Sequence, residues 1–211
     1  MPELPARLRV AVLGAESTGK TALAQALAGR LATPARPVQV VGEYLREWCE
    51  REGRTPRPDE QPAIAAEQAS RADAAPGPVV IADTTPLMTA IYSELLFGDC
   101  SLYPSAFAHQ RRYDLTLVTG LDLPWVADGL QRDGPHVREP VDALLRAALG
   151  SAGIGFRVVY GSGEQRVLNA LAAIAAQAAP PPRASRPWTW VCDKCSDPAC
   201  EHRLFTARLN S

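Results

Sequence analysis

Short apolar segments alternate along this chain with longer segments of helical character. The apolar segments are rich in valine, isoleucine and leucine, which predicts buried strands at 8–13, 38–41, 78–82, 115–118 and 156–160. The intervening segments are rich in alanine and leucine and predict helices at 22–28, 62–75, 86–97, 140–149 and 164–178. Regular alternation of this kind predicts an α/β fold, in which a parallel five-stranded sheet carries helices on both faces.

The pattern ends near residue 179, where the composition changes. Three consecutive prolines, Pro180 to Pro182, open a segment that predicts an extended linker over 180–187. The last segment, 188–211, is rich in cysteine and forms a small separate tail. We therefore expect a main domain over 1–179, a proline-rich linker and a Cys/His-rich tail.

The junction between the first strand and the first helix carries a phosphate-binding motif. Residues 14–21 read GAESTGKT and match the pattern G-x-x-x-x-G-K-[ST] at every required position. Glycines let backbone N–H groups surround nucleotide phosphates, and the following helix adds its positive N-terminal end. The motif predicts a P-loop NTPase-type fold that binds ATP and Mg²⁺ through Gly14, Glu16, Ser17, Thr18, Gly19, Lys20 and Thr21. In this pattern Lys20 reaches the β- and γ-phosphates, and the Thr21 hydroxyl is a ligand of Mg²⁺.

The lysine content supports this interpretation independently. The chain has 22 lysines and arginines, and only Lys20 and Lys194 are lysines. A sequence that uses arginine almost everywhere else retains the compact ammonium group in the phosphate loop, which indicates that the loop requires it.

Composition narrows the class of protein further. The chain has 211 residues, 46% of them hydrophobic, which is enough for a core. The formal net charge of −1 predicts no general affinity for nucleic acid. No apolar run reaches the roughly 20 residues of a membrane helix, and the first residues lack a signal pattern. We expect a cytoplasmic protein, in which the five cysteines are thiols or metal ligands rather than disulfides.

Three carboxylates lie at the predicted carboxyl ends of the strands, where ligands collect in parallel sheets. Glu16 is in the phosphate loop, Glu43 follows the second strand and Asp83 follows the third. Asp83 is the candidate for Mg²⁺, together with Thr21. Glu43 is the first candidate, and Asp83 the second, for the carboxylate that orients an acceptor hydroxyl and accepts its proton. The alternative for each is a helix cap or a solvated charge.

A polar, glycine-bearing stretch over 124–138 follows the fourth strand. It predicts a lid over the phosphates, in which Arg132 and Arg138 stabilise charge on the transferring phosphoryl group. Trp125 offers a flat face for stacking a ring, including a cationic one. The alternative is an ordinary surface loop with Trp125 packed into the core.

Four segments together resemble the ribosylnicotinamide kinase domain of NadR-type proteins. They are GAESTGKT at 14–21, EYLRE at 43–47, ADTTPL at 82–87 and PWVADGL at 124–130, and the resemblance covers roughly residues 8–178. It implies transfer of phosphate from ATP to the 5′-hydroxyl of nicotinamide riboside, which gives nicotinamide mononucleotide. The candidate residues for binding the nucleoside are Glu43, Arg46, Trp125 and Asp128, with Trp125 stacking on the nicotinamide ring and Arg46 contacting the acceptor or pairing with Glu43.

The chain also departs from NadR-type proteins, which can carry a helix-turn-helix and an adenylyltransferase domain before the kinase. Its histidines, His109, His136 and His202, form no His-x-Gly-His motif. We therefore expect neither adenylyl transfer nor repression of transcription.

The cysteine-rich tail contains four candidate zinc ligands. Cys192 and Cys195 have the spacing of a zinc-binding pair, and Cys200 and His202 complete a tetrahedral set. A structural Zn²⁺ site is one interpretation, and free thiols or a redox pair are the others. Cys49 and Cys100 are expected to be small buried hydrophobic residues.

Taken together, these features predict an ATP-dependent small-molecule kinase with nicotinamide riboside as the leading acceptor. The alternatives are a kinase for another nucleoside or nucleotide, and a P-loop ATPase or switch that acts through a partner. The sequence does not predict the oligomeric state.

Overall fold

The computed structural model describes residues 5–126 and 135–178. Five strands form the sheet: β1 Leu8–Leu13, β2 Val38–Val41, β3 Val79–Asp83, β4 Leu115–Thr119 and β5 Arg157–Val159. The helices are α1 Lys20–Leu31, α2 Tyr44–Glu52, α3 Gln61–Ala74, α4 Pro86–Phe97, α5 Tyr103–Gln110, α6 Arg138–Ser151 and α7 Gly163–Ala178, with short 3₁₀ turns at Pro58–Glu60 and Pro135–Val137.

The strands are ordered β2-β3-β1-β4-β5, and every described pairing is parallel. In register, Val10 of β1 lies between Ile81 of β3 and Leu115 of β4. Because β1 is central, the loop that follows it emerges between the ends of β3 and β4. The predicted parallel five-stranded sheet is confirmed.

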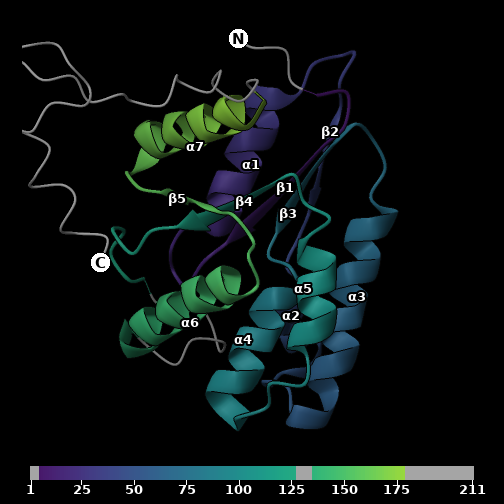
Figure 1. The fold of residues 1–211 in the computed structure, drawn as a ribbon, viewed down its shortest axis with the longest axis vertical. Helices are drawn as coiled ribbons and strands as arrows, with labels where there is room; N and C mark the ends of the chain where they lie inside the picture. The colour runs from purple at the N-terminus through teal and green to yellow at the C-terminus, as the bar shows by residue number, and fades with distance from the viewer. Residues whose placement is uncertain (1–4, 127–134, 179–211) are drawn as a thin grey trace, which may run out of the picture. The chain divides into compact units, whose positions relative to one another are not determined.

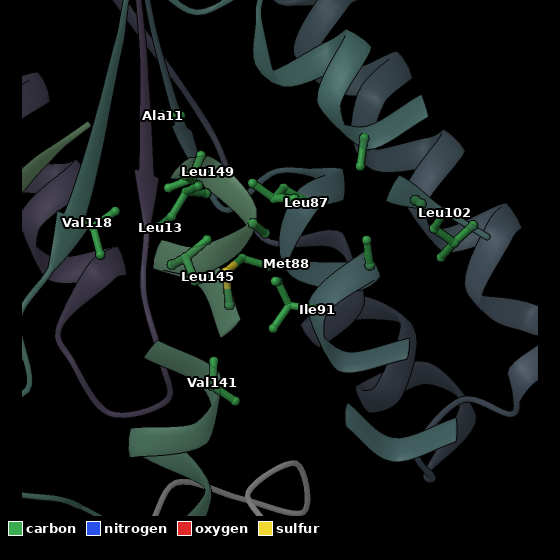
Figure 2. Close-up of a cluster of buried hydrophobic side chains, with 14 of the residues drawn as sticks. Ala11, Leu13, Leu87, Met88, Ile91, Leu102, Val118, Val141, Leu145 and Leu149 are labelled. Atoms are coloured by element: carbon green, nitrogen blue, oxygen red, sulfur yellow. The ribbon is translucent and has the colours of Figure 1, made fainter. Parts of the chain in front are cut away.

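Helices cover both faces of the sheet (Figure 1). On one face α1 and α7 pack against Val10, Val12 and the side chains of neighbouring strands that share their orientation. On the other face α3, α4, α5 and α6 enclose a cluster that includes Ala11 and Leu13 (Figure 2). Successive residues of β1 thus point into two separate cores, and a strand buried on both faces has the continuous apolar run seen in the sequence.

Two helices are absent from the sequence-based prediction. The residues of α2 are mostly charged or polar, and its short apolar side is formed by Trp48 and Cys49 packed on Ile64. The eight-residue α5 has a proline at its second position and contributes Ala106 to the core. Both helices are short and bury few residues, so neither stands out from the neighbouring loops in a single sequence.

The prediction that both early cysteines are buried is half wrong. Cys49 is buried in the structure, and burial raises the pKa of its thiol to about 11. Cys100 is exposed. It lies in the loop after α4, where the apolar helix has already ended at Gly98.

Residues 1–178 form one compact unit. The proposed linker and tail, 180–187 and 188–211, lie outside the described residues. Among the described helices, none is long and apolar enough to cross a membrane.

Candidate active site

The phosphate loop connects β1 to α1 at the carboxyl edge of the sheet. Gly14 has φ +149°, Gly19 has φ +74°, and Ser17 adopts the left-handed region at φ +56°. A Cβ atom on Gly14 would lie 2.0 Å from Oγ1 of Thr119, a distance that no side chain tolerates. The first glycine of the motif is therefore required by the close approach of β4 as well as by its backbone conformation.

Buried hydroxyl groups hold the underside of this loop. Thr18 is fully buried, and its Oγ1 lies 2.7 Å from the Ala15 carbonyl oxygen and 2.7 Å from Oγ1 of Thr119. Thr119 in turn approaches the Leu13 carbonyl oxygen at 3.1 Å. Thr18, predicted as a nucleotide-binding residue, thus directs its side chain into the protein, and what it offers to a ligand is its backbone.

Lys20 begins α1 and curls back over the loop. The Nζ atom of Lys20 donates to the Ala15 carbonyl oxygen at 2.9 Å, so the ammonium group lies against the phosphate loop. Gly19 has no side chain to cap α1, and no acidic residue occupies the first turn. The positive N-terminal end of the helix therefore stays available to an anion.

Asp83, the last residue of β3, is 2% exposed, and its Oδ1 accepts no hydrogen bond from the described residues. Desolvation raises the pKa of its carboxyl, and the nearby Thr21 hydroxyl and the charge of Lys20 partly offset this rise. A solvated charge is thus excluded for Asp83. A buried, incompletely paired carboxylate beside a threonine hydroxyl fits an oxygen-ligated cation such as Mg²⁺.

Glu43 follows β2 and occupies the N-cap position of α2, but its side chain makes no capping hydrogen bond. Its Oε2 lies 3.6 Å from a guanidinium nitrogen of Arg46, and the Glu43 side chain is 17% exposed against 40% for Arg46. The charges of both residues also act on the pKa of Asp83. The structure therefore brings Lys20, Thr21, Glu43, Arg46 and Asp83 to one place.

The segment after β4 contacts the phosphate loop directly. The Ser17 hydroxyl accepts from the Val126 N–H at 2.8 Å and lies 3.1 Å from the Val126 carbonyl oxygen. Trp125, the neighbouring residue, is half-buried, and its indole N–H has no hydrogen-bond acceptor among the described residues. Asp128 and Arg132 lie outside the described residues.

Arg138, predicted to act from the lid, is the first residue of α6. It is 8% exposed, and one guanidinium nitrogen donates to the carbonyl oxygens of Leu123 at 2.9 Å and Leu121 at 3.3 Å. Its side chain thereby ties α6 to the loop that follows β4. A direct role of Arg138 at a phosphoryl group stays a prediction.

Arg166 of α7 is a buried residue that the sequence did not single out. It is 4% exposed and donates to the Thr18 carbonyl oxygen at 2.9 Å, the Gly120 carbonyl oxygen at 3.3 Å and Asp122 at 3.0 Å. One side chain thus supports the phosphate loop and the loop after β4 together. No local pattern marks it, because one arginine in an amphipathic helix resembles any other until its burial is known.

No group of three or more candidate metal ligands occurs among the described residues. The Mg²⁺ candidates, Thr21 and Asp83, are two protein groups, which suits a cation that completes its shell with phosphate oxygens and water. The four candidate zinc ligands of the tail lie outside the described part of the chain.

The chain belongs to a family of AAA domains, whose sequence model matches residues 9–166. This match includes the whole phosphate loop, the two strand-end carboxylates and Arg166. No curated protein is significantly similar to the chain in sequence.

Among solved structures, the fold is similar to NadR in complex with NR, with a TM-score of 0.69 at 21% identity over 85% of this chain and 54% of that one. It is also similar to NadR in complex with NAD and AMP-PNP, with a TM-score of 0.62 at 20% identity over 84% of this chain and 52% of that one. The chain thus spans about half the length of the NadR proteins. At this identity the likeness establishes the fold.

A third match is thymidylate kinase from Ehrlichia chaffeensis, with a TM-score of 0.56 at 15% identity, over 82% of this chain and 99% of the kinase. A fourth is deoxyadenosine kinase from M. mycoides, with a TM-score of 0.53 at 12% identity, over 82% of this chain and 100% of the kinase. The architecture is therefore that of P-loop kinases.

Proposed function

We propose that this protein transfers the γ-phosphoryl group of ATP to a hydroxyl of a small nucleoside, and that nicotinamide riboside is its acceptor. The observation that carries this proposal is the convergence of Lys20, Thr21, Asp83 and the Glu43–Arg46 pair at one edge of the sheet. A nucleotide-hydrolysing switch needs a phosphate loop and a cation site, whereas a second carboxylate with a partner arginine suits a bound acceptor.

The proposed roles follow from position and chemistry. Backbone N–H groups of the phosphate loop, with Lys20, bind the phosphates, while Thr21 and Asp83 hold Mg²⁺. Bound Mg²⁺-ATP supplies the phosphoryl group and positive charge that stabilises its transfer. Glu43 orients the acceptor hydroxyl and accepts its proton, and the Arg46 guanidinium lies 3.6 Å from the Glu43 carboxylate as its ion-pair partner.

The residues of the 124–138 segment complete the proposal. Trp125 would stack on the base or the nicotinamide ring, and Asp128 would hydrogen-bond the acceptor. Arg132 and Arg138 would stabilise charge on the phosphoryl group in flight. NadR in complex with NR has a higher TM-score (0.69) than the other two kinases (0.56 and 0.53), which favours nicotinamide riboside over their acceptors.

The decisive experiment measures ADP release with Mg²⁺-ATP, without acceptor and with nicotinamide riboside, thymidylate or deoxyadenosine. We expect release to depend on nicotinamide riboside and the product to gain one phosphoryl group by mass spectrometry. ADP release with only one of the other acceptors would identify a different substrate and leave the proposed kinase activity standing. Turnover that no acceptor accelerates would overturn the kinase proposal and favour a P-loop ATPase or switch acting through a partner.

Glu43→Gln tests the assignment of the base. The amide keeps the size of the side chain but cannot accept a proton, so acceptor-dependent kcat should fall roughly 10²–10⁴-fold. Binding of ATP, measured by calorimetry, should be preserved. Full transfer activity in this variant would remove Glu43 from the chemistry.

A further inference from the structure

A buried glutamine on α3 connects the two turns that carry the strand-end carboxylates. Gln68 is 2% exposed. Its Oε1 accepts from the Tyr44 N–H at 2.7 Å, and its Nε2 donates to the carbonyl oxygens of Gly42 at 3.1 Å and Thr84 at 3.5 Å. One planar amide therefore binds the backbone on both sides of Glu43.

The Tyr44 contact leaves the Glu43 carboxylate available to the site. Tyr44 is the first residue of α2, and its N–H is one of the donors that a helix start leaves without an internal partner. An N-cap side chain usually serves the donors at such a start. Here Glu43 makes no capping bond and Gln68 satisfies the Tyr44 N–H from another helix.

The Thr84 contact acts on a strained turn directly after Asp83. Thr84 has φ +79° and is 4% exposed. A β-branched residue in this region is strained and persists only when its surroundings hold it. Its N–H donates to the Val12 carbonyl oxygen at 3.0 Å, and its own carbonyl oxygen accepts from Gln68.

We propose that Gln68 is a positioning residue that sets the spacing between the carboxylates of Glu43 and Asp83, and this inference rests on the phosphoryl transfer proposed above. Both turns are bonded to the same amide through their backbones, so neither turn can shift relative to the other without breaking a bond to Gln68. Position 68 must provide, in one planar group, an oxygen that accepts from the Tyr44 N–H and an N–H group that donates to the carbonyl oxygens of Gly42 and Thr84. Among side chains of this length, glutamine supplies both at neutral pH.

The test compares Gln68→Met with the wild-type protein and with Gln110→Met as a matched control. Gln110 is also buried and makes two side-chain hydrogen bonds, to Thr85 behind the Asp83 turn and to Thr116, but it makes none to the turn that carries Glu43. Both variants should lower the unfolding midpoint. Only Gln68→Met should lower acceptor-dependent kcat, by roughly 10²-fold, since a displacement of about 1 Å has that effect.

Gln68→Glu supplies a second readout in case the methionine variant fails to fold. When ionised, the carboxylate of this variant still accepts from the Tyr44 N–H, but it has no proton to donate to the carbonyl oxygens of Gly42 and Thr84. The protonated carboxyl restores one donor. The ratio of mutant to wild-type kcat should therefore rise as the pH falls. Glu43 and Asp83, the carboxylates of the two turns that Gln68 joins, are present in both proteins.

Two measurements separate this inference from the proposed function. Amide hydrogen exchange at Tyr44 should accelerate in Gln68→Met, and the increase in ATP affinity that Mg²⁺ brings should shrink, because Asp83 is no longer held. Neither requires an acceptor. If wild-type protein phosphorylates no nucleoside, the proposed function fails while these readouts still test Gln68. Unchanged exchange at Tyr44, or an equal loss of kcat in Gln110→Met, would overturn the inference.

Discussion

At the scale of single residues, the site depends on conformations and burials that few side chains permit. Gly14 approaches Thr119 so closely that a Cβ has no room, and Asp83 is a carboxylate almost without solvent. Thr84 is held in a left-handed conformation beside it. Each of these features lowers stability by itself, and such costs concentrate where a ligand is to be bound.

Gly14→Ala should weaken ATP binding at least tenfold, which corresponds to about 1.4 kcal/mol. The added Cβ would displace the Thr119 side chain and disrupt the hydrogen bond between the Thr119 and Thr18 hydroxyl groups. Isothermal titration with ATP measures the change. Gly29→Ala is the matched control, because a Cβ at Gly29 in α1 meets nothing within 4 Å. It should raise stability by about 0.5–1 kcal/mol and leave ATP affinity unchanged. Equal affinities in both variants would contradict the steric argument.

Asp83→Asn should abolish Mg²⁺-dependent transfer and yet stabilise the protein without ligand. Burial raises the pKa of Asp83, so the folded state disfavours its ionised form. The amide removes that charge, and the gain in stability should be present at neutral pH. It should shrink as the pH falls through the raised pKa, where the wild-type carboxyl is itself neutral. Thermal unfolding at several pH values, in EDTA, checks this. A destabilised variant at pH 7 would show that the Thr21 hydroxyl and Lys20 stabilise the ionised carboxylate by more than its burial costs.

At the scale of elements, buried polar groups fasten the ends of helices to the sheet. Thr85 caps α4 by accepting from the Leu87 N–H at 3.3 Å, and it donates to Gln110 at 2.6 Å. Gln110, at the end of α5, in turn donates to Thr116 of β4 at 2.9 Å. The start of α4 is thereby fixed directly behind the Asp83 turn.

Thr85→Val should reduce the free energy of unfolding by about 1–3 kcal/mol, because it removes a helix cap and leaves the side-chain Oε1 of Gln110 buried without its donor. Urea denaturation measures the loss. Thr85→Ser retains the hydroxyl and should recover most of the stability. If serine is as destabilising as valine, packing of the threonine methyl group, rather than the hydrogen bonds, explains the effect.

At the scale of the whole molecule, the described cores are self-contained. All members of the buried hydrophobic clusters lie between Leu8 and Ile174. Residues 1–178 also form one compact unit. The stability of the phosphate-binding domain is therefore expected to come from within this unit.

A chain truncated after residue 178 should fold, unfold in one cooperative transition and bind ATP with the affinity of the full chain. Circular dichroism and calorimetry measure both properties.

The full chain should release about one Zn²⁺ per molecule to a chromogenic chelator, and the double variant Cys192→Ser, Cys195→Ser should release none. Release of zinc from the truncated chain would place the metal elsewhere, and no release from the full chain would favour free thiols or a redox pair.

The sequence by itself determined the alternation of strands and helices, the phosphate loop and the strand-end carboxylates, because these depend on local periodicity and short motifs. It did not indicate α2 and α5, which are short and bury few residues, or the exposure of Cys100. Only the tertiary structure decided that Gln68 joins two turns, that Arg166 supports the phosphate loop and that Arg138 is buried. These roles join residues up to 148 positions apart. Hydrogen bonds between buried groups far apart in the chain leave no local pattern in the sequence, because the two partners come together only when the chain has folded.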